Sequence, residues 1–490
     1  MLMKPINRTS ITIFVIIYLL CIIGCQETGR PGDENIKSES EQIIALLKDG
    51  KPEYTIDEAN DMVSELMPLI EDIAGKTFIK PPEIRLINTD KIDELMIREE
   101  NCEKTTNNIL ESKKSENKMM SKFILAIYSK CEHVLYLMPQ RIPVVTRLFG
   151  FDEKYGRDIA KMNIAHELTH ALQDQHINFL TFFEKMNRSE ETHAFLSMIE
   201  GHATFIEKKI GQLLGIEKKI IDAFPLVNHM EGNPKKAAFG SHELTDKFIK
   251  SLPPIQMIYS AGEKFIHYHY NKGGNDKIWY ILNNPPVDTL MITEPEIYSA
   301  KSYDRLNYSD ILNDIYDFHS VVGFHKSDFI YRNDSFSRFD LSQFWEILNI
   351  EDKDLIISKI HNLQNLTIYY KDFQIASIDF IVLSDEKYAS RLSSATTKLL
   401  KQIVKQPNEK KMNLGQCNKG NINVDQKISG IRKYISKENG EEKFFNCNWV
   451  IISKGNVLVT YNDVLLDLED CEILEIANKI FSRYQHAKNL

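Results

Sequence analysis

A single short stretch limits the folds open to this chain more than any other feature of the sequence. Residues 165–176 read AHELTHALQDQH, inside the longer segment GRDIAKMNIAHELTHALQDQ. Apolar residues recur in that segment at three- and four-residue steps, which predicts a long α-helix. Residues four apart share a helix face, so His166 and His170 project side by side, with Glu167 one step around the helix. The fold must therefore give two adjacent imidazoles a partner, which is either solvent or a shared ion.

The spacing of these three residues favours the shared ion. In an HExxH helix the two imidazoles bind a metal, the glutamate acts on a water molecule, and one coordination position stays open. The chain holds 14 histidines in 490 residues, so HExxH is expected by chance on the order of a few hundredths of a time. The alternative is a solvent-facing helix that carries polar histidines.

A catalytic zinc site needs a third protein ligand, and the segment SMIEGHAT offers Glu200. Glu200 lies inside a second predicted helix, at about residues 190–214, and a carboxylate among apolar neighbours requires a cation. His202 is the competing ligand, but on a helix it faces elsewhere because it lies two residues away. We assign His193 and His176 to loops or to the surface. The expected ligands are therefore His166, His170 and Glu200.

The pattern HELTH followed by a helix glutamate resembles the gluzincin branch of zinc metallopeptidases. More narrowly, HELTHALQDQH with a later EGxA segment resembles uncharacterised exported bacterial and archaeal HExxH proteins, in which a further stretch reads PPxST…HPxxY. Here residues 285–298 read PPVDTLMITEPEIY, and the resemblance covers about residues 55–300. It implies one Zn²⁺ per chain, Glu167 as the catalytic base, and a peptide or protein substrate. It also implies a zincin-like fold that is mostly helical with a small mixed sheet.

The sequence departs from those relatives at three positions. Glu294 stands where the later stretch usually has histidine, and His202 where EGxA often carries aspartate. Thr204 replaces the aspartate that many gluzincins use to orient a ligand histidine. Because ligand imidazoles need such an outer partner, Asp174 or Glu207 is expected to supply it.

Peptide hydrolysis also requires an oxyanion donor and a place for the substrate backbone. Tyr259, His267 and His269 are candidates for the donor on spacing alone. The β-favouring run HVLYLMP precedes the metal-binding helix and reads as a strand. We expect it to form the sheet edge to which an extended peptide adds.

The N-terminus indicates export. Lys4 and Arg8 precede the uncharged apolar run ITIFVIIYLLCIIGC, which suits the central region of a secretory signal better than a full membrane span. The run ends in Gly24 and Cys25, which resembles a bacterial lipobox. We therefore expect a signal peptide over residues 1–25, lipidation of Cys25 and a flexible tether over residues 26–45. The alternative is an uncleaved membrane anchor.

The length of the chain exceeds that of one compact core. We expect the metallopeptidase domain over residues 46–350 and a smaller α+β accessory domain over residues 351–490. In the latter, FQIASIDFIVLS reads as a strand, YASRLSSATTKLLKQIV as a helix, and NWVIISKGNVLVTYND as a hairpin. The fold class is therefore α+β. A net charge of −9 without a basic block excludes nucleic acid as the main partner.

Five cysteines follow Cys25, and none forms a CxxC pair. In an oxidising setting we expect Cys102 to pair with Cys131 and two of the last three, Cys417, Cys447 and Cys471, to pair with each other.

No GxSxG elbow, P-loop or GxGxxG introduces a strand–helix unit, so serine hydrolase and nucleotide-binding functions lack support. The sequence favours an exported, membrane-anchored zinc metallopeptidase. The alternative is a non-catalytic surface lipoprotein that binds a partner or an envelope component. In that case a fourth ligand, such as His202 or His193, closes a structural zinc site.

Overall fold

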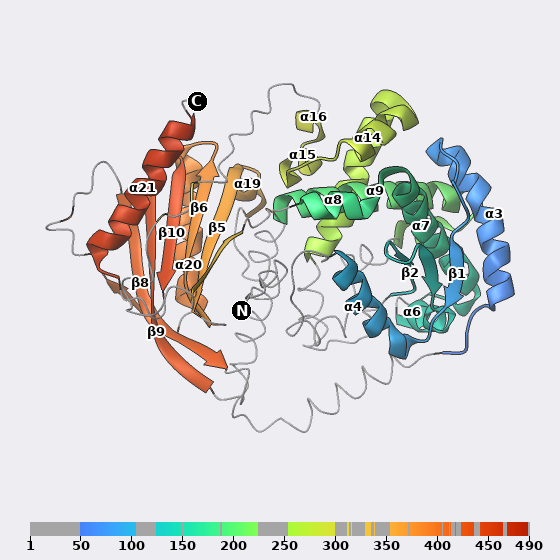
Figure 1. Ribbon diagram of the computed structural model, residues 1–490, viewed down its shortest axis with the longest axis horizontal. Helices are drawn as coiled ribbons and strands as arrows, with labels where there is room; N and C mark the ends of the chain where they lie inside the picture. The colour runs from blue at the N-terminus through green and yellow to red at the C-terminus, as the bar shows by residue number, and fades with distance from the viewer. Residues whose placement is uncertain are drawn as a thin grey trace, which may run out of the picture. The chain divides into compact units, whose positions relative to one another are not determined.

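The computed structural model divides into two compact units, with a boundary near residue 299 (Figure 1). Unit 1 comprises residues 1–187 and 191–299, and unit 2 comprises residues 188–190 and 300–490. Both contain helices and strands, as the α+β prediction requires. The structure describes residues 50–103, 124–148, 151–186, 189–223, 253–298, 311–312, 315, 329–334, 338, 353–370, 373–403, 405–410, 412, 417, 423–435, 442–463 and 468–488.

The boundary between the units lies about fifty residues before the one expected at 350. The reason is β4 (Phe329–Asp334), which pairs with β5 (Ile360–Tyr370) and so belongs to the second sheet. The described residues begin at Gly50. They therefore do not include the expected signal peptide, the expected lipidation site Cys25 or the expected tether. Among the described helices, none combines the length with the apolar composition that a membrane span requires.

Unit 1 is built mainly from helices around a small mixed sheet. Strands β1 (Glu83–Leu86) and β3 (Val134–Leu137) pair in parallel, and β2 (Ala126–Ser129) pairs antiparallel with β3. The order is β1-β3-β2, so β3 is the central strand. The expectation that HVLYLMP forms the peptide-binding edge was therefore wrong. The short segment AIYS of β2 lies at the edge instead, and it packs against α7 (Gly156–Ile177).

The helices of unit 1 begin and end where local chemistry predicts. The structure assigns helices α3 (Ile56–Ala74), α4 (Ile92–Glu103), α6 (Ile142–Leu148), α7, α8 (Phe179–Lys185), α9 (Ser189–Leu213), α10 (Lys218–Ala223), α14 (Pro253–Asn283), α15 (Thr289–Thr293) and α16 (Pro295–Tyr298). Thr55 and Glu58 form a capping box at the start of α3, and Gly75 ends it in the left-handed region with φ 65°. Non-helical backbone at Gly273 and Gly274 kinks α14.

Two glycines let α9 and α14 pass each other in backbone contact. A Cβ added at Gly201 would overlap the carbonyl group of Gly262, and one added at Gly262 would lie 3.2 Å from Cα of Gly201 and overlap the carbonyl oxygen of Ser197. No larger side chain fits between these backbones. The crossing therefore fixes how closely the two helices approach.

Disulfides join Cys102 to Cys131 in unit 1 and Cys417 to Cys471 in unit 2. Their Cα–Cα distances are 6.0 Å and 5.2 Å, within the usual range. The expected pairing is confirmed, and Cys447 is the buried cysteine that remains reduced.

Unit 2 is a seven-stranded antiparallel sheet with helices on both faces. Its order is β4-β5-β6-β10-β9-β8-β7. The other strands are β6 (Phe373–Leu383), β7 (Lys405–Lys410), β8 (Asn423–Ile435), β9 (Glu442–Lys454) and β10 (Val457–Asp463). Figure 1 shows α20 (Glu386–Ile403) on one face and α21 (Asp470–Lys488) on the other, each over its own apolar core. The expected hairpin turns at Gly455, which has φ 59°. A short helix, α19 (Lys353–Ile357), precedes β5.

We predict that Gly201→Ala destabilises unit 1. The new methyl group has backbone on its far side, and backbone cannot rotate away as a side chain can. The cost should be at least about 2 kcal/mol in the free energy of unfolding, measured by urea denaturation.

Gly211→Ala is the matched control on the same helix. Its Cβ would meet Sδ of Met162 at 2.7 Å and the side chain of Ile221, which can adjust. Alanine also favours helix over glycine by about 1 kcal/mol, so the control should stay close to the parent. Equal losses in the two variants would contradict the close crossing.

Candidate metal site

The three expected ligands meet between α7 and α9. His166 and His170 lie one turn apart on α7 and are both buried, and Glu200 reaches them from α9. Oε2 of Glu200 lies 3.0 Å from Nε2 of His166 and 3.3 Å from Nε2 of His170. The two Nε2 atoms are 3.1 Å apart. The residues offer one donor atom each, all within 4.8 Å of one another.

These separations match the requirements of a small tetrahedral ion. Bonds of about 2.0–2.1 Å at tetrahedral angles place two donor atoms about 3.3 Å apart. Two imidazole nitrogens and one carboxylate oxygen also form a donor set typical of zinc. The residues therefore fit a metal ion, and among the described residues no fourth histidine, cysteine or carboxylate joins the group.

Each ligand imidazole is held by an oxygen on its other side. Nδ1 of His166 lies 3.0 Å from Oε2 of Glu207, and Nδ1 of His170 lies 2.8 Å from Oε1 of Gln173. Both oxygens accept, so each Nδ1 carries a proton, which leaves the two Nε2 atoms as the nitrogens that would bind a metal ion. Of the two expected outer partners, Glu207 takes this place. Gln173 was not predicted, although it lies three residues after His170 on the same helix face.

The orientation of Gln173 is fixed by its own amide group. Nε2 of Gln173 donates to the carbonyl oxygen of Ile199 at 2.9 Å and lies 3.0 Å from Nδ1 of His202. Oε1 must therefore face His170. The ring of His202 also packs edge-on against Trp279, with centroids 5.8 Å apart. Burial, together with the charge of His170, lowers the pKa of His202 to about 3, so His202 is a neutral hydrogen-bond partner outside the ligand group.

The other histidines considered as ligands lie elsewhere. Nε2 of His176 donates to the carbonyl oxygen of Thr77 at 2.9 Å. His193 is outside the group of donor atoms formed by the described residues.

The electrostatics of the ligands show a site that attracts positive charge. Burial alone raises the pKa of Glu200, but the charge of His170 and hydrogen bonds from both imidazoles bring it well below its usual value. Burial also lowers the pKa of His166, yet its hydrogen bonds to Glu200 and Glu207 raise it above the usual range. The buried carboxylate of Glu207 and the partly buried carboxylate of Glu200 thus stabilise whatever cation lies between the helices.

Glu167 stands beside the ligand group and is fixed by the edge strand. The backbone N–H of Tyr128 in β2 donates to Oε2 of Glu167 at 2.7 Å. Burial raises the pKa of Glu167, and the charges of His170 and His166 counteract part of that increase. Glu167 is a carboxylate that does not belong to the ligand group but lies next to it in sequence and in space.

The phenol of Tyr128 attaches β2 to α7 at a second point. Its hydroxyl donates to Oδ2 of Asp174 at 2.9 Å and lies 3.1 Å from Nδ1 of His133. Oδ1 of Asp174 accepts from the backbone N–H of Phe179 at 2.7 Å. Asp174 therefore anchors the edge strand and the start of α8. It is not the outer partner of a ligand histidine.

Of the three candidate oxyanion donors, Tyr259 reaches the site. Its ring centroid lies 6.0 Å from that of His166, and its hydroxyl donates to Glu200. Burial and the charges of Glu200 and Glu167 raise its pKa well above the usual value, so the hydroxyl keeps its proton. Tyr259 precedes Gly262 by one helical turn, and Gly201 follows Glu200. The close helix crossing thus brings this phenol to this carboxylate.

The two other candidates point away from the ligands. His267 is exposed and its Nδ1 lies 3.0 Å from Nδ2 of Asn271. His269 is buried against the rings of Phe265 and Tyr298. Glu294 ends α15 and is not in the ligand group.

We predict that Glu207→Gln weakens metal binding while the fold is kept. The substitution preserves shape but removes the charge that fixes the proton on Nδ1 of His166. Loss of such an outer partner reduces metal affinity by roughly 10- to 100-fold, which a competition titration with a zinc chelator measures. Glu65→Gln is the control, because Glu65 of α3 forms an ion pair at 2.7 Å with Lys161 of α7, the helix that carries His166. Unchanged affinity in Glu207→Gln would contradict this role.

Comparisons of the chain with protein-family models, with curated proteins and with solved structures found no match. The function of the site is therefore argued from its own residues and their geometry.

Proposed function

We propose that this chain is a zinc-dependent metallopeptidase of the gluzincin type. His166, His170 and Glu200 would bind one Zn²⁺, and Glu167 would act as the general base on peptide or protein substrates. One observation carries the proposal. Three donor atoms converge at tetrahedral separations, and a half-buried carboxylate outside the ligand group, Glu167, stands beside them. A zincin-like arrangement of unit 1 belongs to the same proposal.

The three-ligand arrangement supports catalysis over a structural role. A structural zinc site is closed by four protein ligands, whereas a catalytic one keeps a position for water or substrate. His202, the nearest candidate for closing the site, is held by Gln173 and Trp279. A zinc ion bound here would supply a Lewis acid and would lower the pKa of a coordinated water toward neutrality.

The protein groups around the ligands have complementary tasks. Glu167 is positioned by the N–H of Tyr128 to accept a proton from the attacking water and later to return it to the leaving amine. Tyr259, on α14, retains its hydroxyl proton and lies beside His166 and Glu200. It is therefore the group that we assign to the developing oxyanion.

The edge strand β2 is the surface that we assign to the substrate backbone. Ile127 and Ser129 face β3 through the antiparallel ladder, so the backbone groups of Ala126 and Tyr128 face outward. The N–H of Tyr128 is bound to Glu167, which leaves the N–H and C=O of Ala126 and the C=O of Tyr128. An extended peptide that pairs with these groups would run past Glu167.

We further propose that the protein is exported and held at the bacterial cell envelope through lipidated Cys25. The motif and the two disulfides support an oxidising compartment. In metabolic labelling with a radioactive fatty acid, the parent should be labelled and Cys25→Ser should not. Cys21→Ser is the control, since Leu20 before it is too bulky for the motif. Equal labelling of Cys25→Ser and the parent would exclude this anchor.

The decisive experiment separates metal binding from chemistry. Glu167→Gln should retain one zinc per chain and the parental melting temperature, because Glu167 is not a ligand. Its cleavage of a peptide library should fall by several orders of magnitude, because activation of the water is lost. Zinc content, melting temperature and cleavage rate are measured on the same preparations.

His166→Ala is the companion variant and should lose both zinc and cleavage. Equal cleavage by Glu167→Gln and the parent would show that another base operates. Failure of the zinc-loaded parent to cleave any peptide, with four protein ligands by X-ray absorption, would favour the structural zinc site.

A further inference from the structure

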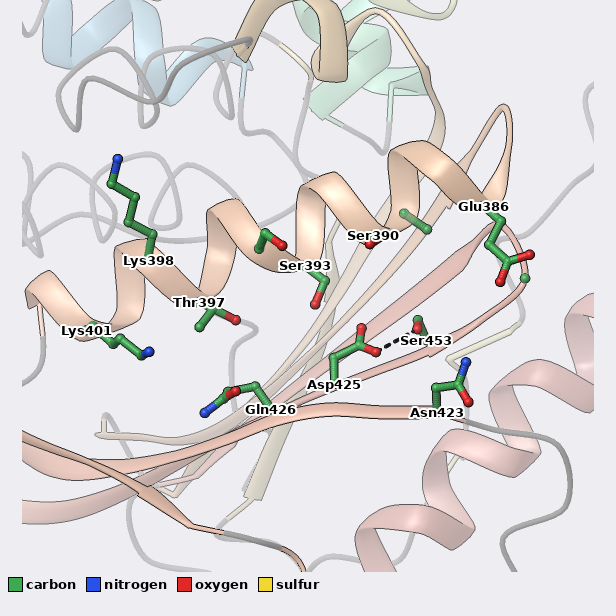
Figure 2. A pocket seen from close by; sticks show the side chains of 13 residues that line it. Glu386, Ser390, Ser393, Thr397, Lys398, Lys401, Asn423, Asp425, Gln426 and Ser453 are labelled. Carbon is green, nitrogen blue, oxygen red and sulfur yellow. Dashed lines mark hydrogen bonds between the residues drawn. The ribbon is translucent and has the colours of Figure 1, made fainter.

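Unit 2 contains a cleft of about 570 Å³ between α20 and the sheet (Figure 2). Its volume falls within the range of small-ligand sites. The lining residues come from α20 and from the ends of β8 and β9, and they are almost all polar: Glu386, Ala389, Ser390, Ser393, Ser394, Thr397, Lys398, Lys401, Asn423, Asp425, Gln426, Ser453 and Gly455.

The strand wall of the cleft is formed at a β-bulge. Val424 pairs with Ile452 and Gln426 with Ile451, so Asp425 is the extra residue in β8. A bulge redirects a side chain that regular pairing would place otherwise. The carboxylate of Asp425 is turned toward α20 and accepts a hydrogen bond from Oγ of Ser453 at 3.0 Å (Figure 2). Its second oxygen remains available on the cleft side.

The helix wall presents hydroxyl groups to that carboxylate. Ser393 and Thr397 lie one turn apart on α20 and point toward the strands (Figure 2). Ser393 is 5% exposed, and its hydroxyl points toward the strand wall of the cleft (Figure 2). A hydroxyl in this position can both donate to and accept from a ligand in the cleft.

The charges in the cleft select against an anion. Lys401 forms an ion pair with Glu409 of β7, and Glu409 also accepts from Nε2 of Gln426 at 2.9 Å. Lys398 points away from the strands (Figure 2). The carboxylates of Asp425 and Glu386 are therefore not compensated inside the cleft, and a phosphate or sulfate would meet repulsion.

The cleft also disfavours an apolar ligand, and β9 offers no free backbone edge to an added strand. β9 pairs with β8 on one side and with β10 on the other, so its N–H and C=O groups are used in the ladders. No aromatic residue lines the cleft. The remaining groups are hydroxyls, amides and one fixed carboxylate, which both donate to and accept from a ligand that is itself rich in hydroxyls.

From these features we infer that the cleft between α20 and the β8–β9 wall binds a neutral saccharide, with Asp425, Ser393 and Thr397 as its central hydrogen-bonding groups. This site is independent of the metal site of unit 1. It would give unit 2 a recognition role of its own.

The test uses the full chain in a detergent without a sugar headgroup. Maltotriose, cellotriose and triacetylchitotriose are titrated by isothermal calorimetry, with tripolyphosphate and triserine as the charged and peptide probes. At least one trisaccharide should bind with a Kd below about 1 mM. Thr397→Val and Asp425→Asn should each weaken that binding about tenfold or more, because each removes a hydrogen-bonding group or its charge.

Thr396→Val is the matched control, because Thr396 neighbours Thr397 on α20 but does not line the cleft. It should bind as the parent does. Melting temperatures of all variants separate lost binding from lost folding, and at least one of the two cleft variants must melt as the parent does. The inference is overturned if no trisaccharide binds, if binding is equal in Thr397→Val, Asp425→Asn and the parent, or if tripolyphosphate or triserine binds in their place.

Discussion

The placement of two carboxylates on one face of α9, Glu207 buried and Glu200 partly buried, is the constraint on which the rest of unit 1 depends. Glu200 and Glu207 lie seven residues apart, so both face α7. An unpaired buried carboxylate is costly, and His166 compensates both, with one ring nitrogen 3.0 Å from each. This double contact fixes the orientation of the His166 ring, holds α7 and α9 together and directs Nε2 toward Glu200, where a metal ion would bind. The arrangement of the metal ligands therefore follows from the way His166 pairs with both carboxylates between α7 and α9.

The strand and helix beside α7 and α9 are held to them at fixed points. Tyr128 binds α7 twice, through its N–H to Glu167 and through its hydroxyl to Asp174, so the edge strand cannot slide along the helix. On the other side, Gly201 and Gly262 bring α14 into backbone contact with α9. The packing of secondary-structure elements, and not loops, thus fixes the positions of Glu167, the three ligands and the phenol of Tyr259. A preorganised site requires such an arrangement.

Most of the ligand group could be predicted from the sequence because helical periodicity is local. HExxH fixes the relation of His166 and His170, and apolar neighbours mark Glu200 as a carboxylate in need of a cation. The outer partners were harder to predict, because Glu207 and Asp174 both lie in apolar helices and only packing decides between them. Tyr259 could not be separated from His267 by spacing, since the contact depends on where α14 crosses α9.

The sheet and the domain boundary show the same limit. The run HVLYLMP was correctly predicted as a strand, but its position in the strand order depends on AIYS. That segment is too short to show the alternation of a strand in the sequence. Likewise β4 belongs to the second sheet through pairing with β5, a contact between segments about thirty residues apart. Strand existence is a local property, whereas strand order is set by long-range pairing.

Unit 1 and unit 2 use inward-facing polar residues in two different ways. In α7, each polar side chain that faces the interior has a protein partner: Gln173 has Ile199 and His170, and Asp174 has Tyr128 and Phe179. Such closed networks hold a structure in one arrangement. In α20, the hydroxyls of Ser393 and Thr397 point into the cleft (Figure 2). A network of protein partners orients other residues, whereas hydroxyls that line a cleft can bind a ligand, and this distinction separates the scaffold of the metal site from the contact surface of the cleft.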